Sequence, residues 1–316
     1  MLPMRTFRCP HCDASVFFDD DCCLNCGTDL GYRPEDDEMV RAVEGVRCDG
    51  HAVWDCPWLL SDGVGWCRSC RLDVADPTAS TGPDRSEFER AKRRVVRQLM
   101  HAGIDLHAQP QLRFEFKRSE PGKNVSIGHS DGLVTLDLAE ADPVTAERVR
   151  AELGEPYRTP LGHVRHETGH WHWQAWVATV PERLERFREL FGDERADYAA
   201  ALDAHYSRAD DGSWRDRYVS FYASAHPWED YAESFAHVFH LRDTTETATA
   251  NAALGVVANI FGPFDELYDQ WLGLSVAFNE LARSMGVADL YPFAPPRPAV
   301  DKLRFAYEVL LAQPIT

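Results

Sequence analysis

The residues best suited to chemistry are the five letters HETGH at positions 166–170. His166 and His170 are four residues apart, so on an α-helix their imidazoles lie one turn apart on the same face. Two imidazoles in that arrangement can bind one zinc ion, and Glu167 can act as general base on a water molecule that the metal activates. The pattern therefore predicts a hydrolytic zinc centre that needs a third protein ligand.

A helix over 160–177 must carry this motif. An apolar stripe at helical spacing runs beside the two histidines and consists of Leu161, Val164, Trp173, Trp176 and Val177. Pro160 suits a first helical turn, and only Gly169 weakens the interior of the helix.

The third ligand must come from elsewhere in the chain. The metzincin pattern would need Gly at 173 and His at 176, and both positions are Trp. The remaining common solution is a glutamate from a later helix, and the best candidates are Glu229 and Glu233, which share one helical face with His237. Carboxylates on an otherwise apolar helix are costly to bury unless they are paired or bind a metal. We predict Glu229 as the ligand and Glu233 as the carboxylate that orients a ligand histidine, with Glu233 on zinc and His237 behind it as the alternative.

The nine cysteines all lie before residue 71. Because their number is odd and most fall in C-x-x-C pairs, they are interpreted as metal ligands rather than disulfides. Two four-thiolate zinc sites are predicted, from Cys9, Cys12, Cys23 and Cys26, and from Cys48, Cys56, Cys67 and Cys70. Cys22 is left over and could replace Cys23, and His11 is a weaker substitute ligand. Closed tetrathiolate sites are structural, because no position is open for catalysis.

Length and composition indicate a small module followed by a large domain. The chain has 316 residues, of which 44% are hydrophobic and 11% aromatic, enough for a real core. We predict a zinc-ribbon module at 1–76, a linker at 77–86 and a larger domain at 87–316. The net charge of −18 counts against nucleic-acid binding. No apolar run has the length of a signal peptide or a membrane span, so a cytoplasmic protein without membrane contact is expected.

The predicted fold class is α+β, mostly helical with a small sheet. A helix is expected over 86–102, and its basic residues, Arg90, Lys92, Arg93, Arg94 and Arg97, are interpreted as a solvated face. A strand is predicted at 112–117 and a hairpin at 124–138 that turns at Asp131 and Gly132. Further helices are predicted at 143–153, 182–191, 194–206, 228–241, 264–285 and 300–312. A sheet before an H-E-x-x-H helix is the order found in zincins, in which an edge strand, here 133–138, can hold an extended peptide.

Three segments together resemble a known family. HETGHWHW, ERFRELFGDERADYAAAL and SFYASAHPWEDYAESFAH are similar to a bacterial family of zinc-binding metallopeptidases with an amino-terminal zinc-ribbon domain. The resemblance covers nearly the whole chain, including the paired cysteines. It implies a gluzincin-like zincin fold and hydrolysis of peptide or protein substrates.

A second resemblance concerns the third ligand. EDYAESF is similar to the third-ligand helix of anthrax lethal factor, in which the first glutamate binds zinc, and this implies Glu229 here. A tyrosine seven residues before that ligand stabilises the oxyanion there, and Tyr222 holds the matching position, with a core tyrosine as the plainer interpretation. His226 is a further candidate for stabilising the oxyanion. The alternative is that it simply precedes a proline at the start of a helix.

Two other functions compete with hydrolysis. In one, the ribbons recruit a protein partner and the zincin domain is secondary or inactive. The intact H-E-x-x-H motif argues against a catalytically inactive domain. In the other, the ribbons bind nucleic acid through Arg47, Arg68 and Arg71. The hydrolase hypothesis predicts three zinc ions per chain, one catalytic and two structural.

Overall fold

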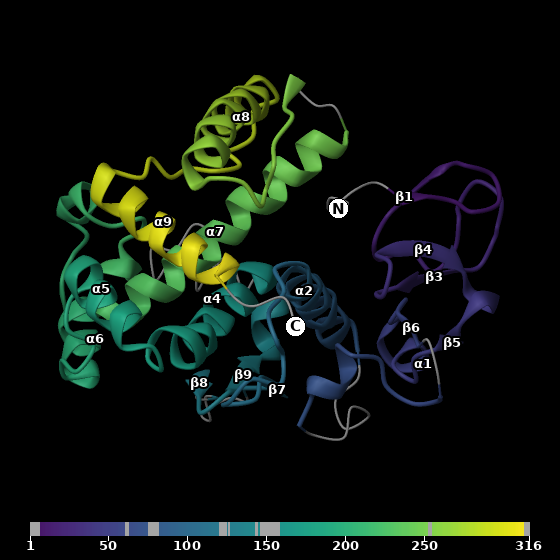
Figure 1. Cartoon of the computed structure of the whole chain (residues 1–316), viewed down its shortest axis with the longest axis horizontal. Coiled ribbons are helices and arrows are strands. Elements are labelled where there is room, and N and C mark those ends of the chain that lie inside the picture. Colours follow the sequence, from purple (N-terminus) through teal and green to yellow (C-terminus); the bar gives the residue numbers. More distant parts are fainter. Residues whose placement is uncertain are drawn as a thin grey trace.

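Short antiparallel strand pairs form the cysteine-rich part of the chain, at the right of Figure 1. The computed structural model describes residues 7–60, 63–74, 82–119, 125, 127–142, 145, 159–251 and 255–312. β1 pairs with β2, β3 with β4, and β5 with β6. Their bounds are β1 Phe7–Arg8, β2 Ser15–Val16, β3 Leu30–Arg33, β4 Glu38–Arg41, β5 Val46–Arg47 and β6 Leu59–Leu60, with helix α1 at His51–Trp54. With helices after this region and only small sheets, the fold class is α+β, as predicted.

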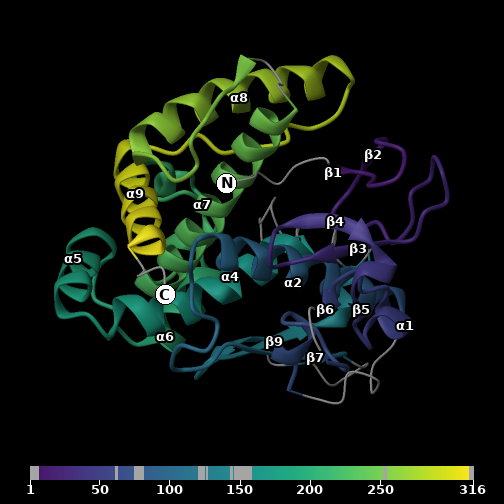
Figure 2. The ribbon, with the colours of Figure 1, turned by 45° about the vertical axis from the view of Figure 1, so that its right-hand side comes forward.

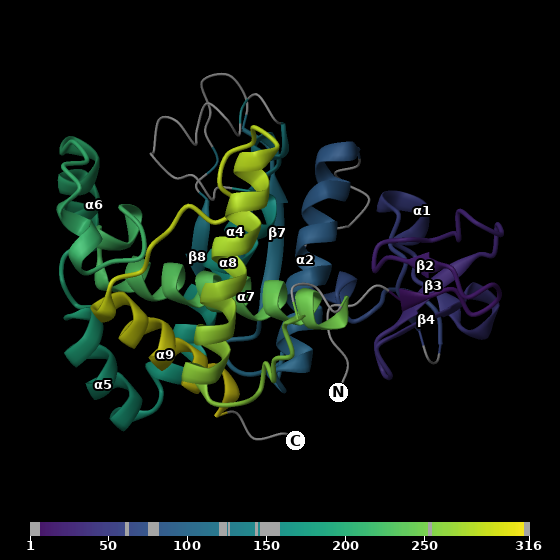
Figure 3. The ribbon, with the colours of Figure 1, turned by 90° about the horizontal axis from the view of Figure 1, so that it is seen from above.

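Helix α2 (Pro83–His101) joins this region to the rest of the molecule and lies between the two in Figures 1 and 3. It begins at Pro83, because proline is well suited to the first helical position. Residues 83–86 of the predicted linker are therefore helical, and 75–81 fall outside the described residues.

The prediction of a solvated basic face on α2 holds for the exposed Arg90 but was wrong for three of the five residues. Lys92, Arg93 and Arg97 are at most 1% exposed, because acidic residues of the cysteine-rich part face them. Lys92 Nζ lies 2.5 Å from Asp73 Oδ1, and Arg97 Nε lies 2.8 Å from Asp37 Oδ1. The spacing of these cations reflects an internal charged contact between the two parts of the chain.

A three-stranded sheet lies below helix α4 (Pro160–His172) in Figure 2. The strands are β7 (Arg113–Lys117), β8 (Gly128–Ser130) and β9 (Leu133–Asp137), in the order β7-β9-β8. β8 and β9 form the predicted hairpin, and β7 pairs with β9 in parallel. The prediction that 133–138 is the edge strand was wrong. β9 is central because it pairs on both sides, and β7 and β8 are the two edge strands.

Helices α4 and α7 (Pro227–Ala250) cross at close range. A Cβ atom on Gly169 would lie 3.0 Å from Cα of Ala232, so the absence of a side chain at 169 permits this approach. The glycine that weakens α4 as a helix is thus the residue that lets α7 come near. Beyond His172 the chain continues as a π-helix at Trp173–Val177, so the predicted helical segment over 160–177 is present.

The remaining helices surround this pair. They are α5 (Pro181–Phe191), α6 (Tyr198–Ser207), α8 (Phe264–Ser284) and α9 (Arg297–Leu311). Each matches a predicted helix to within a few residues, whereas α7 extends nine residues past the predicted end at 241 because its second half also packs against α8. The helix predicted at 143–153 falls largely outside the described residues. No helix in the described ranges is long and apolar enough to cross a lipid bilayer.

Candidate metal centres and active site

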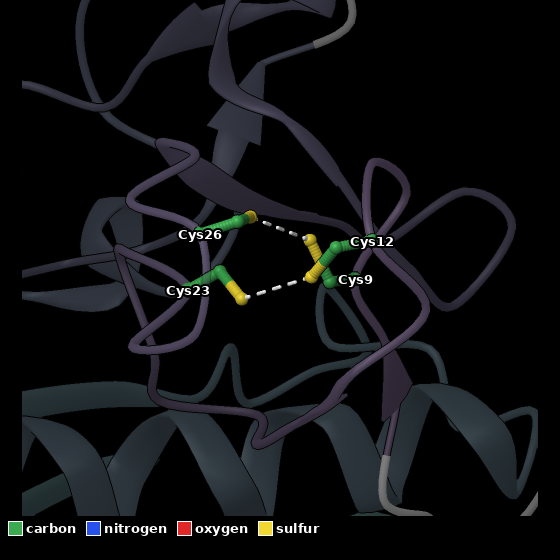
Figure 4. A group of neighbouring side chains, drawn as sticks. All are labelled: Cys9, Cys12, Cys23 and Cys26. Atoms are coloured by element: carbon green, nitrogen blue, oxygen red, sulfur yellow. Dashed lines mark hydrogen bonds between the residues drawn. The ribbon is translucent and has the colours of Figure 1, made fainter.

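The four cysteines of the first predicted site converge from two loops, as Figure 4 shows. Sγ of Cys9 lies 3.7 Å from Sγ of Cys26, and Sγ of Cys12 lies 3.7 Å from Sγ of Cys23. A tetrahedron with zinc–sulfur bonds of about 2.3 Å has sulfur–sulfur edges of about 3.8 Å. The sulfur positions therefore fit a zinc tetrathiolate.

The second set of cysteines is fully buried and has the same dimensions. Sγ of Cys56 lies 3.8 Å from the sulfurs of both Cys67 and Cys70. The backbone N–H groups of Gly50 and Cys67 donate to Sγ of Cys48, at 3.4 and 3.2 Å, as they would to a thiolate. The structure brings Cys48 together with Cys56, Cys67 and Cys70, the predicted set, despite the irregular spacing of these residues in the sequence.

The two substitute ligands lie outside these clusters. Cys22 Sγ is 3.8 Å from the backbone oxygen of Cys23, and the Cys22 backbone forms a β-bridge with Asp29. Nδ1 of His11 contacts the guanidinium of Arg41 at 3.0 Å. Neither residue belongs to either four-sulfur group.

Helix α4 presents His166 and His170 toward α7. Thr159 caps the helix by accepting a hydrogen bond from the Gly162 N–H at 3.0 Å, which fixes where the first turn begins. One turn separates the two imidazoles, whose ring centroids are 4.9 Å apart. Both rings are more than 90% buried, so a charge placed between them is largely shielded from solvent.

Glu229, in the first turn of α7, approaches both histidines. Its Oε2 lies 2.9 Å from Nε2 of His166 and 3.4 Å from Nε2 of His170. Donor atoms of one tetrahedral zinc with bonds of about 2.0–2.1 Å lie about 3.3 Å apart. The three atoms fall within 4.8 Å of one another, the spacing expected of ligands to one metal.

Glu233, one turn further along α7, contacts the other side of His166. Its Oε1 lies 2.8 Å from Nδ1 of His166, and Ser220 donates to its Oε2 at 2.6 Å. Nδ1 of His237 lies 2.5 Å from the hydroxyl of Tyr291. The structure therefore brings Glu229 to Nε2 of both histidines and Glu233 to Nδ1 of His166.

The charges around His166 favour a cation between these groups. Burial lowers the pKa of His166, but hydrogen bonds to Glu229 and Glu233 outweigh it and hold the pKa well above its ordinary value. Burial raises the pKa of Glu229, yet His170 and His166 bring it well below the usual range. A positive charge is thus stabilised between Nε2 of His166 and Oε2 of Glu229.

Glu167 lies on the same side of α4, next to a residue that the sequence did not reveal. Its Oε1 is 3.2 Å from Nε2 of His163, whose Nδ1 is 3.0 Å from Glu140. Burial raises the pKa of Glu167, but His163 and the other two histidines offset this and lower it. Oε2 of Glu167 is buried and has no hydrogen-bond partner among the described residues, so an acceptor is available for a water or substrate group. This orphaned acceptor, with the nearby donor set, fits a hydrolytic zinc centre.

Two predicted catalytic residues differ in their surroundings. The Tyr222 ring lies 5.7 Å from the His166 ring and lines the cleft beside it. His226 instead caps α7: Nδ1 accepts from the Trp228 N–H at 3.1 Å, and Nε2 contacts the Ala196 oxygen at 3.2 Å. Both ring nitrogens of His226 contact backbone groups. The structure therefore favours the interpretation of His226 as a helix-capping residue over a catalytic role.

A cleft of about 420 Å³ passes over the centre. Its walls include residues that sequence reasoning missed, namely His129, His163, Tyr198, Leu202, Tyr206, Trp228, His240 and Phe293. The Tyr198 hydroxyl donates to Oε1 of Glu229 at 2.6 Å. The four-residue spacing of Tyr198, Leu202 and Tyr206 was a signal from which this wall could have been predicted.

Comparison with known proteins agrees with this geometry. Residues 84–309 match the family described as "Putative zinc-binding metallo-peptidase", and residues 6–81 match a zinc-ribbon domain. Uncharacterized proteins of Mycobacterium tuberculosis and Mycobacterium bovis are each 39% identical over 326 residues, covering 97% of this chain and 95% of theirs. No solved structure gives a significant match. The chain therefore belongs to this family of zinc-binding metallopeptidases and carries an amino-terminal zinc-ribbon domain.

Proposed function

We propose that the protein is a gluzincin-like zinc peptidase in which His166, His170 and Glu229 hold the catalytic metal. The observation that carries this proposal is the approach of Glu229 Oε2 to Nε2 of both histidines, at 2.9 and 3.4 Å. The two cysteine clusters would hold structural zinc ions, which gives three zinc ions per chain.

Glu233 would hold His166 in the tautomer that a ligand needs. A carboxylate on Nδ1 keeps the proton there and leaves Nε2 free to bind a metal. The contact of Glu233 with Nδ1 and the hydrogen bond from Ser220 support this role.

Zinc in this position supplies Lewis acidity, which acidifies a water molecule and polarises a carbonyl group. Glu167 then accepts the proton of the attacking water at Oε2 and returns it to the leaving nitrogen. His163, held by Glu140, orients the Glu167 carboxylate through its contact with Oε1. Tyr222, at the wall of the cleft, is the candidate donor to the oxyanion.

The edge strand β8 would align the substrate. An edge strand has N–H and C=O groups that can pair with an extended peptide, and residues 127–129 line the cleft above the histidines. This arrangement favours a peptide as substrate. The role of pairing with the substrate, which was predicted for residues 133–138, is therefore proposed for β8.

Zinc content and peptide cleavage, measured on the same samples, test the proposal. The wild type is expected to contain three zinc ions and Glu229→Ala about two, because the remaining histidine pair binds the metal poorly. Glu233→Ala is expected to keep three at saturating zinc, with affinity for one ion lowered about 10- to 100-fold. Glu167→Gln should keep all three and lose cleavage of a proteome-derived peptide library.

A wild-type content of two zinc ions or fewer, or a Glu167→Gln variant that cleaves at the wild-type rate, would reject the assignment. Loss of one zinc in Glu233→Ala but not in Glu229→Ala would instead exchange the roles of the two glutamates.

A further inference from the structure

One face of helix α6 borders the cleft beside the histidines. Tyr198, Leu202 and Tyr206 are four residues apart, so their side chains share one face of the helix, and all three line the cleft. The Asp197 side chain caps α6 by accepting from the Ala200 N–H at 3.1 Å, which fixes where the stripe begins. Tyr198 and Tyr206 are 38% and 54% exposed, so large aromatic surface is available within the cleft.

Two aromatic side chains complete this wall and connect it to the metal ligands. The Trp228 ring lies 5.9 Å from that of Tyr198 and 4.2 Å from that of His170. The Tyr222 ring lies 6.5 Å from that of Tyr206 and 5.7 Å from that of His166. We call the set Tyr198, Leu202, Tyr206, Tyr222 and Trp228 the aromatic wall. A group that contacts it lies next to the atoms that would hold the metal.

The Tyr198 hydroxyl is already engaged, which leaves its ring face as the contact surface. It donates to Glu229 at 2.6 Å, and burial together with the negative charge of Glu229 raises the pKa of Tyr198, so the phenol stays neutral. The ring is thereby held in a fixed orientation.

The other residues that line the cleft have a different character. They include His163, His237, His240 and Phe293, and the carboxylates of Glu167, Glu229 and Glu233. Among the described residues that line the cleft there is no Lys or Arg, and the aromatic wall contains no ionisable side chain that is charged near neutral pH. An apolar side chain of a substrate would therefore find complementary apolar surface at the aromatic wall.

We propose that the aromatic wall is a subsite for an aromatic or large aliphatic side chain of the substrate, next to the bond that is cut. The proposal rests on the peptidase function proposed above and adds the class of residue that the cleft selects. Burial of one large apolar side chain typically corresponds to discrimination of roughly 10- to 100-fold between phenylalanine and alanine.

Two acetylated dipeptide hydroxamates that differ only in a phenylalanine or an alanine side chain test the subsite by binding alone. Calorimetry on the zinc-loaded full chain is expected to show the phenylalanine compound binding at least 10-fold more tightly. Leu202→Asp, which introduces a charge into the wall, and Tyr206→Ser, at an exposed position, should each reduce this ratio to about threefold or less. Leu272→Asp is the matched control, because Leu272 is 45% exposed on α8 and does not line the cleft; it should keep the wild-type ratio.

Equal affinities in the wild type, a ratio that survives in both wall variants, or no measurable binding of either compound would overturn the subsite. Cleavage of a proteome-derived peptide library separates this result from the parent proposal. Cleavage without side-chain preference would reject the subsite and retain the peptidase. Selective hydroxamate binding without cleavage of any peptide would retain the subsite and reject the peptidase.

Discussion

Glu229 and Glu233 differ by one helical turn, and their neighbours separate their roles. Glu229 contacts Nε2 of two histidines, whereas Glu233 contacts Nδ1 of one and a serine hydroxyl. Both contacts require α7 to approach α4 closely, and that approach occurs where Gly169 faces Ala232. The geometry of the centre thus depends on Gly169, which has no side chain and is not itself a candidate ligand.

Replacement of Gly169 by valine should therefore disturb the catalytic centre. The added side chain would meet the Ala232 backbone and separate the helices, at a cost of about 1–3 kcal/mol. We expect one zinc ion to be lost or weakly held, while the two ribbon zinc ions remain. Elemental analysis after dialysis, with thermal unfolding on the same sample, measures both effects.

Gly273→Val is the control for this prediction. Gly273 also lies inside a helix, α8, but a Cβ atom there would have no neighbour within 4 Å. It therefore carries the same small gain in helix propensity without the steric conflict. Equal zinc contents in the two variants would contradict the role assigned to Gly169.

The sequence predicted the residues that act through short spacing. The histidine pair, the C-x-x-C motifs and the hairpin turn at Asp131 and Gly132 are local patterns, and the structure contains each of them. The contacts of His163 with Glu140 and of Tyr198 with Glu229 were missed because each joins residues from different elements. The spacing of Tyr198, Leu202 and Tyr206 places Tyr198 on a helix face but does not reveal its partner.

At the scale of elements, helix α2 supplies buried cations to the zinc ribbon. Arg93 is fully buried, and within the described part of the chain none of its three guanidinium nitrogens has a hydrogen-bond partner. Burial lowers the pKa of Arg93, but negative charge on Cys56, Glu89 and Asp19 more than offsets this, so the guanidinium stays charged. A zinc tetrathiolate carries a net charge of −2, which gives this cation its compensating partner.

Arg93→Met should make the second zinc site more reactive. Without the cation, the thiolates of Cys56 and Cys70 lose their electrostatic stabilisation and become better nucleophiles. We expect alkylation of these two cysteines to accelerate several-fold, measured residue by residue by mass spectrometry. The cysteines of the first site serve as the internal reference.

Arg90→Met controls for the substitution itself. Arg90 lies on the same helix but is 47% exposed and pairs only with Glu87, at 3.8 Å, in the described ion pairs. Alkylation rates of Cys56 and Cys70 that are the same in both variants would exclude compensation by Arg93.

The basic residues of α2 show that a run of cations on a helix can either face solvent or form buried ion pairs. A run of arginines and lysines on a helix usually faces solvent, and that expectation failed for Lys92, Arg93 and Arg97. Their partners Asp73, Asp19 and Asp37 come from three separate loops, so only the fold brings them together. The edge position of β8 escaped prediction for the same reason, since it depends on the parallel pairing of β7 with β9.

At the scale of the whole molecule, the ribbon and the peptidase part are joined by more than the chain. The backbone N–H of Val74 donates a hydrogen bond to the backbone oxygen of Phe114 in β7 at 3.0 Å. This bond connects the end of the cysteine-rich part to the three-stranded sheet. Asp37 binds Arg97 through two hydrogen bonds of 2.8 and 2.9 Å, and accepts a third from Tyr32 at 2.7 Å. Burial raises the pKa of Asp37, but His101 and Arg97 outweigh it and lower the pKa to about 2. The carboxylate is therefore ionised near neutral pH and balances the buried guanidinium.

Asp37→Asn should consequently destabilise both parts together. Removing one charge of a buried pair typically costs about 3–5 kcal/mol, because the other charge remains without compensation. Calorimetry of the full chain is expected to show a single unfolding transition whose midpoint temperature falls by several degrees.

Asp36→Asn is the adjacent control. Asp36 pairs with Arg33 at 2.6 Å but is 46% exposed, so loss of this pair should cost less than about 1 kcal/mol. Two separate transitions, of which only one moves in Asp37→Asn, would show that the ribbon unfolds independently and that its buried charges do not stabilise the helices around the catalytic centre.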